Sequence, residues 1–208
     1  AVTASTGIAS THIGGMTIHS WSGIGIAKSL SSWDIDRIAS NERIAKRVER
    51  TTTLVIDEIS MLDGKTLECV DQVCRAVKRR EEPFGGIQVI FVGDFFQLPP
   101  VSRQGEPAPQ FAFSSNAWVA VSPLVCYLSE QYRQEDTVFL DLLASLRRDQ
   151  ILPHHVEHLN QRCWADSTNL SKDTPKLYSH NVDVDRINAG ELDRIVAEQQ
   201  EYQMEFTG

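Results

Sequence analysis

Two short apolar runs that end in acidic residues constrain the fold of this chain more than any other feature. Leu54-Val55-Ile56 is followed by Asp57-Glu58, and the run from Ile87 to Val92 is followed by Gly93-Asp94. Short runs without polar alternation are typical of strands that are buried on both faces of a parallel sheet. Residues 65–80 lie between them and have the apolar spacing of an amphipathic helix. We therefore expect an α/β fold in which helices cover both faces of a parallel sheet.

The other expected elements follow from the same patterns. Further strands are expected at 1–6 and 125–128, and residues 177–179 could start another. Residues 7–25 are rich in Ser, Thr, Gly and His and predict a long polar loop. Residues 149–175 are polar and show no strong period, although 156–159 are compatible with a helix. Helices are expected at 34–50 (one or two), 115–121, 138–148 and 183–198.

Composition excludes several classes of protein. The chain has 208 residues, of which 41% are apolar and 23% are charged, and this is ordinary globular composition. No apolar run approaches the roughly 20 residues that cross a bilayer, and no signal peptide is visible, so we expect neither membrane association nor secretion. The net charge of −8 argues against nucleic-acid binding through bulk charge, but it leaves a local groove open. The scattered cysteines favour buried thiols in a reducing compartment: Cys69, Cys74, Cys126 and Cys163.

The acidic ends of the two strands predict a nucleotide site, because ligands bind at the carboxyl ends of parallel strands. Asp57 can hold Mg²⁺, which prefers oxygen ligands, and Glu58 can orient or deprotonate an attacking water. Asp94 adds a third carboxylate, and the neutral amide of Gln97 suits a sensor of the γ-phosphate. The alternatives remain open: an acidic helix cap at Asp57-Glu58, and a turn with two core phenylalanines after Gly93.

Two other segments carry polar groups that suit a phosphate ligand. Residues 3–22 combine hydroxyls, glycines, histidines and a tryptophan, and such a surface can bind a single nucleic-acid strand. A solvent-exposed Ser/Thr loop is the alternative. Arg133, after the expected strand 125–128, can neutralise charge on a phosphate, although an ordinary surface arginine has the same sequence. A zinc site is disfavoured, because no second cysteine pair accompanies His154, His155, His158 and Cys163.

Several of these segments, in this order, resemble the motifs of one enzyme family, the Pif-type (petite integration frequency) DNA helicases, which belong to superfamily one and its RecD-like branch. Residues 3–10 and 13–21 resemble motif Ia and its extension, and Asp57-Glu58-Ile59-Ser60-Met61 resembles motif II. Residues 86–88 and 93–101 are similar to motif III, and Tyr132-Arg133-Gln134 is similar to motif IV. The segment 177–188 resembles the opening of the family's second motor domain.

The resemblance implies a motor of two RecA-like domains, of which residues 1–148 form part of the first, 149–175 the linker and 176–208 the start of the second. It implies ATP-driven translocation on single-stranded DNA, five-prime to three-prime, with unwinding of forked duplex or G-quadruplex DNA in replication, repair, recombination or telomere maintenance. Asp57 would hold Mg²⁺, Glu58 would activate water, and Gln97 and Arg133 would contact the γ-phosphate of ATP. The residues implied to grip DNA are Thr3, Ser5, Thr6, Gly15, His19 and Pro99.

The chain departs from the family pattern in one respect. It contains no Gly-x-x-x-x-Gly-Lys-Ser/Thr loop, whose amides and lysine cradle phosphates. We therefore expect very weak ATP binding and no competent unwinding from these residues alone. Because Ala1 opens the chain inside an expected strand, we expect a piece of a longer helicase rather than a naturally shortened relative.

Two other functions remain as alternatives. One is a binding module that holds single-stranded DNA or a partner without hydrolysing ATP. The other is a metal nuclease that uses Asp57, Glu58 and Asp94, although no catalytic Lys or His accompanies these carboxylates. We expect a monomer, located in the nucleus or mitochondria of a eukaryote or in the cytoplasm of a bacterium.

Overall fold

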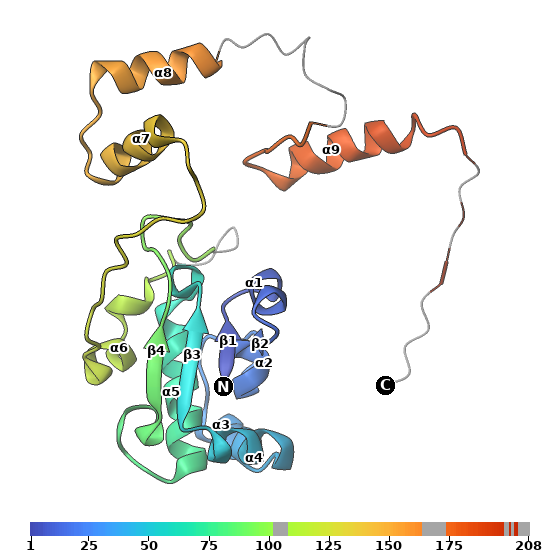
Figure 1. Cartoon of the computed structure of the whole chain (residues 1–208). Coiled ribbons are helices and arrows are strands. Elements are labelled where there is room, and N and C mark those ends of the chain that lie inside the picture. The colour runs from blue at the N-terminus through green and yellow to red at the C-terminus, as the bar shows by residue number, and fades with distance from the viewer. Residues whose placement is uncertain (102–107, 164–173, 198–199, 201, 204–208) are drawn as a thin grey trace. The chain divides into compact units, whose positions relative to one another are not determined.

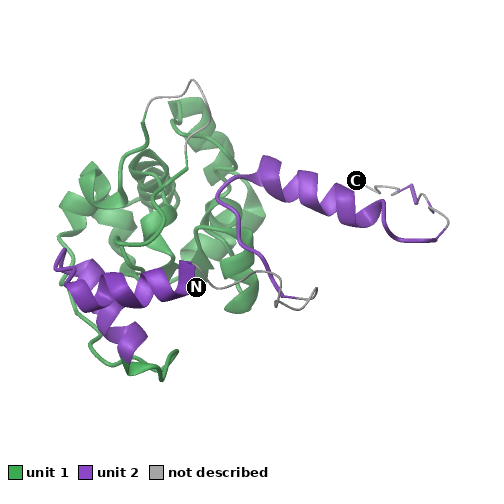
Figure 2. Ribbon diagram, turned by 90° about the horizontal axis from the view of Figure 1, so that it is seen from above, with its two compact units in different colours: residues 1–137 green, residues 138–208 purple. Residues whose placement is uncertain are grey.

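The computed structural model describes residues 1–101, 108–163, 174–197, 200 and 202–203. The chain divides into two compact units, residues 1–137 and 138–208, which Figure 2 distinguishes by colour. Figure 1 labels the helices and strands.

The first unit is built on a parallel sheet of four strands in the order β2-β1-β3-β4. Thr3 of β1 pairs with Ile56 of β3, and Ile56 pairs with Phe91 of β4. The parallel α/β fold predicted from the two acidic-ended strands is confirmed. The bounds of the strands are β1 Val2–Ala4, β2 Met16–Thr17, β3 Thr53–Asp57 and β4 Gln88–Phe91.

One face of this sheet forms the core. Leu54 and Ile56 of β3 are fully buried and belong to the same cluster as the apolar side of α5 (Gly64–Lys78). Each fully buried side chain of this size contributes about 1.5–3 kcal/mol to stability. On the opposite face, Val2 and Ile90 keep 48% and 43% of their surface exposed. β4 is therefore not buried on both faces, although its continuous apolar run predicts that it is.

Local capping explains where the predicted helices begin. Residues 34–50 fall into two helices, α3 (Ser32–Ala39) and α4 (Glu42–Arg50), separated by Ser40 and Asn41. Ser31 and Asp34 form a reciprocal capping box at α3, and the Asn41 side chain accepts the first free amides of α4. The remaining helical elements of this unit are η1 Ile59–Met61, η2 Pro83–Gly86, η3 Ala112–Ser114 and α6 Asn116–Val121.

The prediction of a loop at residues 7–25 is wrong. The segment contains α1 (Gly7–His12), β2 and α2 (Ile18–Ser22). The Thr6 hydroxyl caps α1 by accepting a hydrogen bond from the Ala9 amide, and the Thr17 hydroxyl caps α2 by accepting one from the Ser20 amide. The hydroxyls that suggest a loop by composition therefore act as helix caps, which is the role that Ser and Thr favour most.

The strand predicted at 125–128 is not formed. Residues 122–136 have no helix or strand, and Tyr127 and Leu128 are 90% and 94% exposed. A strand needs a partner that accepts and donates backbone hydrogen bonds, and no segment among the described residues pairs with this one. Its apolar composition alone could not supply that partner.

Helix α7 (Thr137–Arg147) belongs to the second unit except for its first residue. The second unit also contains α8 (Pro153–Cys163) and α9 (Asn181–Leu192). α7 confirms the helix predicted at 138–148. α9 begins two residues before the helix predicted at 183–198 and ends at Leu192, so the predicted C-terminal part of that helix is wrong for residues 193–197. The predicted linker contains α8, and the strand suggested at 177–179 is absent, since these described residues are irregular. None of the helices in the described part of the chain combines the length and apolarity of a membrane span.

Candidate nucleotide and DNA site

The carboxylates of Asp57 and Glu58 lie where β3 ends. Both residues are half-buried, and Glu58 adopts a left-handed backbone conformation with φ 53° and ψ 44°. The amide of Glu58 donates to Oδ1 of Asp57 at 2.9 Å, and the amide of Ile59 donates to the Val92 carbonyl at 3.0 Å. A left-handed non-glycine residue is uncommon and strained, and such strain clusters at functional sites. The sharp turn at Glu58 leads from β3 into η1 and holds both carboxylates at the end of the strand.

The next strand, β4, leads into a tight turn at the same edge of the sheet. A Cβ atom on Gly93 would lie 2.9 Å from the backbone nitrogen of Ile59, so glycine allows β4 and η1 to approach closely. Asp94 accepts the amide of Phe96 at 3.1 Å and the side-chain amide of Gln97 at 3.3 Å. The Asp94 carboxylate therefore orders the turn that carries Gln97, and Gln97 itself is exposed.

Arg133 is exposed in the irregular segment 122–136. Across the described part of the chain, no hydrogen bond or ion pair joins its guanidinium to Asp57, Glu58 or Gln97. Asp57 is the last residue of β3 and lies one residue beyond the Ile56–Phe91 pair. The Gly93–Gln97 turn follows β4, which is the neighbouring strand. The structure thus brings Gln97 to the edge that holds Asp57, whereas the role of Arg133 stays a prediction.

The carboxylate oxygens at this edge are suitable ligands for a magnesium ion. Asp57 uses Oδ1 for the Glu58 amide, and neither its Oδ2 nor the Glu58 carboxylate has a protein partner within the described residues. Free carboxylate oxygens beside a half-buried strand end suit a hard divalent cation.

The segment with the predicted DNA-binding residues starts beside Asp57. The amide of Ser5 donates to the Asp57 carbonyl at 3.0 Å, so the end of β1 adjoins the end of β3. The Ser5 hydroxyl is buried and finds no hydrogen-bond partner in the part of the chain that the structure describes. Thr6 uses its hydroxyl to cap α1, and Thr3 is fully buried with its hydroxyl donated to the Val55 carbonyl at 2.7 Å. The hydroxyl of Thr3 is thus used in a hydrogen bond within the sheet.

The other predicted DNA residues lie after α1 and after β4. Gly15 is exposed, and a Cβ there would lie 2.5 Å from the Val2 carbonyl oxygen, so only glycine fits. His19, in α2, is half-buried, and this burial lowers the pKa of its imidazole. The neutral ring can therefore stack or hydrogen-bond near neutral pH. Pro99 is exposed while the next residue, Pro100, is buried, which anchors the exit of the Gly93–Gln97 turn.

One residue near this segment was missed by the sequence interpretation. Arg47 of α4 donates through Nη2 to the carbonyl of Ser20 at 2.9 Å and approaches the sulfur of Met16 at 3.5 Å. It thereby fixes α2, which carries His19, against α4. The only signal in the sequence was the basic spacing of the residues that form α4.

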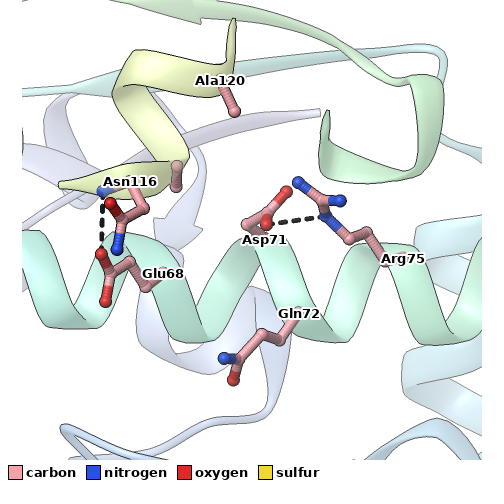
Figure 3. Close-up of a pocket in the computed structure, with 7 residues that line it drawn as sticks. Glu68, Asp71, Gln72, Arg75, Asn116 and Ala120 are labelled. Atoms are coloured by element: carbon pink, nitrogen blue, oxygen red, sulfur yellow. Dashed lines mark hydrogen bonds and ion pairs between the residues drawn. The ribbon is translucent and has the colours of Figure 1, made fainter. Parts of the chain in front are cut away.

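A cavity elsewhere in the first unit is separate from these residues. It has a volume of about 250 Å³ and lies between α5 and α6 (Figure 3). Asp71 pairs with Arg75 at 2.8 Å and accepts the Phe84 amide at 2.6 Å, and Glu68 accepts the Asn116 amide at 2.8 Å. These contacts join α5 to η2 and to α6. The polar groups around this cavity are therefore committed to the fold.

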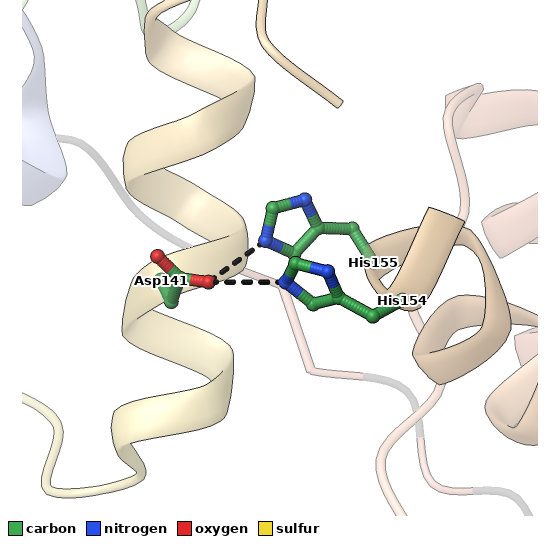
Figure 4. A group of neighbouring side chains, drawn as sticks. All are labelled: Asp141, His154 and His155. Atoms are coloured by element: carbon green, nitrogen blue, oxygen red, sulfur yellow. Dashed lines mark hydrogen bonds and ion pairs between the residues drawn. The ribbon is translucent and has the colours of Figure 1, made fainter. Parts of the chain in front are cut away.

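The second unit groups Asp141 with His154 and His155 (Figure 4). Buried His155 accepts the amide of Leu152 on Nδ1 at 3.0 Å, so the neutral ring carries its proton on Nε2 and donates it to Oδ2 of Asp141 at 2.8 Å. The hydrogen bond between His155 and Asp141 ties α8 to α7. The histidine hydrogen bonds lower the pKa of Asp141. His158 and Cys163, named in the zinc alternative, do not belong to the group.

The parallel sheet, with its carboxylate pair at the end of β3 and a Gln-bearing turn after β4, is the core of a RecA-like nucleotide-binding fold. A profile of PIF1-like helicases matches residues 1–145, and the chain therefore belongs to the PIF1-like helicase family. The resemblance seen in the motifs is confirmed.

Two relatives and two solved structures show the extent of the similarity. The chain is 42% identical over 200 residues to the ATP-dependent DNA helicase Pif1 of a Psychrobacter species, and 37% identical over 203 residues to the ATP-dependent DNA helicase PIF1 of Saccharomyces cerevisiae. The Pif1 helicase from Bacteroides in complex with ADP-AlF3 and single-stranded DNA aligns with a TM-score of 0.80 at 30% identity. The Candida albicans Pif1 helicase aligns with a TM-score of 0.77 at 33% identity.

These alignments cover most of this chain but less than half of the other proteins. The two relatives align with 92% and 94% of the chain, which spans 30% and 23% of their own lengths. Each of the two structures covers 95% of the chain, which spans 48% and 44% of theirs.

Proposed function

We propose that this chain is the central part of an ATP-dependent DNA helicase that moves along single-stranded DNA from five-prime to three-prime and unwinds forked duplex or G-quadruplex DNA. Membership of the PIF1-like family supports the helicase class. The Bacteroides relative crystallised with ADP-AlF3 and single-stranded DNA supports the two ligands. Replication, repair, recombination and telomere maintenance are the processes in which such an activity would act, in a monomer located in the nucleus, mitochondria or bacterial cytoplasm.

The observation that carries this proposal is the hydrogen bond from the Ser5 amide to the Asp57 carbonyl. It joins the end of β1, where the predicted DNA-binding segment starts, to the end of β3, where the predicted catalytic carboxylates lie. A movement of the Asp57–Glu58 turn during a nucleotide cycle would therefore act directly on the backbone of that segment. Coupling between hydrolysis and movement along DNA requires such a physical link.

The residues at this edge would divide the chemistry among them. Asp57 would hold Mg²⁺, which supplies charge neutralisation to the phosphates when it is bound. Glu58 would orient the attacking water and accept its proton, and the Gln97 amide would contact the γ-phosphate. Arg133 would stabilise the charge that develops on that phosphate. Ser5, Thr6, Gly15, His19 and Pro99, with Thr3 beneath them in the sheet, would form the DNA-binding side.

The test compares ATP hydrolysis by the full-length protein and its Glu58→Gln variant, with and without a single-stranded oligonucleotide. Removal of a general base typically costs about 10²–10⁴-fold in rate, so the variant should lose DNA-stimulated turnover while it keeps DNA binding. Glu81→Gln, a substitution of an exposed acidic residue between α5 and η2, serves as the matched control. Undiminished turnover in Glu58→Gln would remove Glu58 from its role.

The second candidate function is that of a binding module, and a Bacteroides Pif1 structure bound to single-stranded DNA supports the strand as its ligand. The 208-residue chain would then bind single-stranded DNA or a protein partner without hydrolysis. Binding of an ATP analogue separates the two functions. A full-length protein that binds DNA but no nucleotide would favour the binding module.

A further inference from the structure

Helix α4 carries a continuous basic face. Arg43, Lys46, Arg47 and Arg50 are spaced three or four residues apart, so their side chains are neighbours on the helix surface. We call these four residues the α4 basic face. Arg43 and Arg50 are exposed, and neither forms an ion pair with a described residue, whereas Lys46 pairs with Glu42. In a chain of net charge −8, this cluster is a local exception.

The stability of the helix does not explain the cluster. Like charges three and four residues apart destabilise a helix, and here Arg43 faces Arg47 while Lys46 faces Arg50. The helix dipole favours cations in the last turn, which accounts for Arg47 and Arg50. Arg43 lies in the first turn, where the dipole disfavours a cation. An anionic partner outside the helix explains the arrangement better than the helix does.

Arg47 connects this face to the predicted DNA-binding segment. Its Nη2 donates to the Ser20 carbonyl at 2.9 Å, directly after His19, and its Nη1 lies 3.5 Å from the Met16 sulfur. Its Nε is buried and meets no hydrogen-bond partner among the described residues. No carboxylate among the described residues lies within ion-pair distance of the Arg47 guanidinium. The positive charge of Arg47 beside His19 is therefore not neutralised by a described carboxylate.

We propose that the α4 basic face binds the phosphate backbone of DNA and continues the DNA path of residues 3–22 across α4. The proposal rests on the proposed function and adds a surface to it. Guanidinium groups suit phosphate oxygens, and such contacts position a strand without reading its sequence. A cluster on one helix face, contiguous through Arg47 with the His19 helix, favours an extended polyanion over an acidic protein segment.

The experiment measures binding of the full chain to a fluorescein-labelled oligothymidylate over a series of KCl concentrations. The double variant Arg43→Gln/Arg50→Gln removes two exposed charges, and circular dichroism checks that it is folded. Each phosphate contact on a single strand contributes about 0.7 to the slope of log affinity against log salt, so the slope should decrease by about 1.4. The affinity at low salt should fall about tenfold or more.

A matched control removes the same charge elsewhere. Arg148 and Arg162 of the second unit are exposed and form no ion pair with a described residue. Arg148→Gln/Arg162→Gln should change the affinity by less than about twofold. An equal loss in both double variants would mean that only net charge matters, and it would overturn the proposal.

The remaining outcomes separate this inference from the proposed function. An unchanged salt slope in Arg43→Gln/Arg50→Gln, together with weakened binding in His19→Ala, would refute the basic face and leave the helicase proposal standing. A chain that binds no oligonucleotide at all would refute both. Intact DNA binding combined with lost binding of an acidic peptide such as oligoglutamate would assign the face to a protein partner and overturn the proposal.

Discussion

Replacement of Gly93 by alanine tests the close approach on which the candidate site depends. The added Cβ would lie 2.9 Å from the backbone nitrogen and 3.0 Å from Cγ2 of Ile59. Carbon contacts are most favourable at about 3.5–4.0 Å, so the turn after β4 and η1 must separate by roughly half an ångström or more. Overpacking of this kind costs about 1–3 kcal/mol. Since one of the two clashing atoms belongs to the backbone, side-chain rotation alone cannot relieve it.

Urea unfolding followed by tryptophan fluorescence measures this cost. Trp118 is a suitable reporter, because its ring stacks on that of Phe91 at a centroid distance of 4.6 Å and β4 ends two residues before Gly93. Gly7→Ala is the matched control. A Cβ there meets no atom within 4 Å, so we expect a stabilisation of about 0.4–1 kcal/mol.

The same substitution should affect activity in the full-length protein. Separation of the turn from η1 displaces the segment that directly follows Glu58, and a misplacement of about 1 Å can cost about 100-fold in rate. A Gly93→Ala variant whose unfolding free energy stays within about 0.5 kcal/mol of the unmodified chain, with normal ATP turnover, would refute the reasoning.

Two further predictions concern protonation and thiol reactivity. Burial lowers the pKa of the His19 imidazole in the folded state, so the unfolded chain binds a proton at His19 more readily than the folded chain does. The free energy of unfolding should therefore be highest above about pH 6.5 and fall as the pH drops through the folded pKa. Unfolding measured from pH 8 to 5 should show a shallower fall in His19→Gln than in His12→Gln, an exposed histidine, and equal slopes would contradict the assignment. Burial also raises the pKa values of two thiols. Cys69 and Cys74 are buried, whereas Cys126 and Cys163 are exposed. Ellman's reagent should therefore react rapidly with only the exposed pair in the native chain. Rapid reaction of all four cysteines would be inconsistent with the structure.

Local patterns were sufficient to predict β3 and β4. A continuous apolar run that ends in Asp57-Glu58 or Gly93-Asp94 combines a strand propensity with a polar stop, and both signals lie within a few residues of each other. The amphipathic spacing of α5 is equally local, since a helix face repeats every three or four residues. The carboxylate pair, the Gln97 turn and the resemblance to the helicase family are therefore properties of short segments of the amino-acid sequence.

The short helices α1 and α2 and the irregular segment 122–136 could not be predicted in this way. Whether Thr6 and Thr17 cap helices or decorate a loop depends on backbone angles that composition does not specify. Whether residues 125–128 form a strand depends on a partner strand elsewhere in the chain. Both are decided by contacts between residues that are distant in sequence or by turns that such contacts stabilise.

The order of motifs in the sequence determined the class of this protein and the residue types at its candidate site. Only the tertiary structure decided that Ser5 hydrogen-bonds to Asp57, because hydrogen bonding between β1 and β3 joins residues 52 positions apart. Only the structure placed Arg47 against Ser20, 27 positions earlier in the chain. Side-chain types and local periodicity belong to short stretches of chain, whereas proximity across a sheet or between helices exists only once the whole unit has folded.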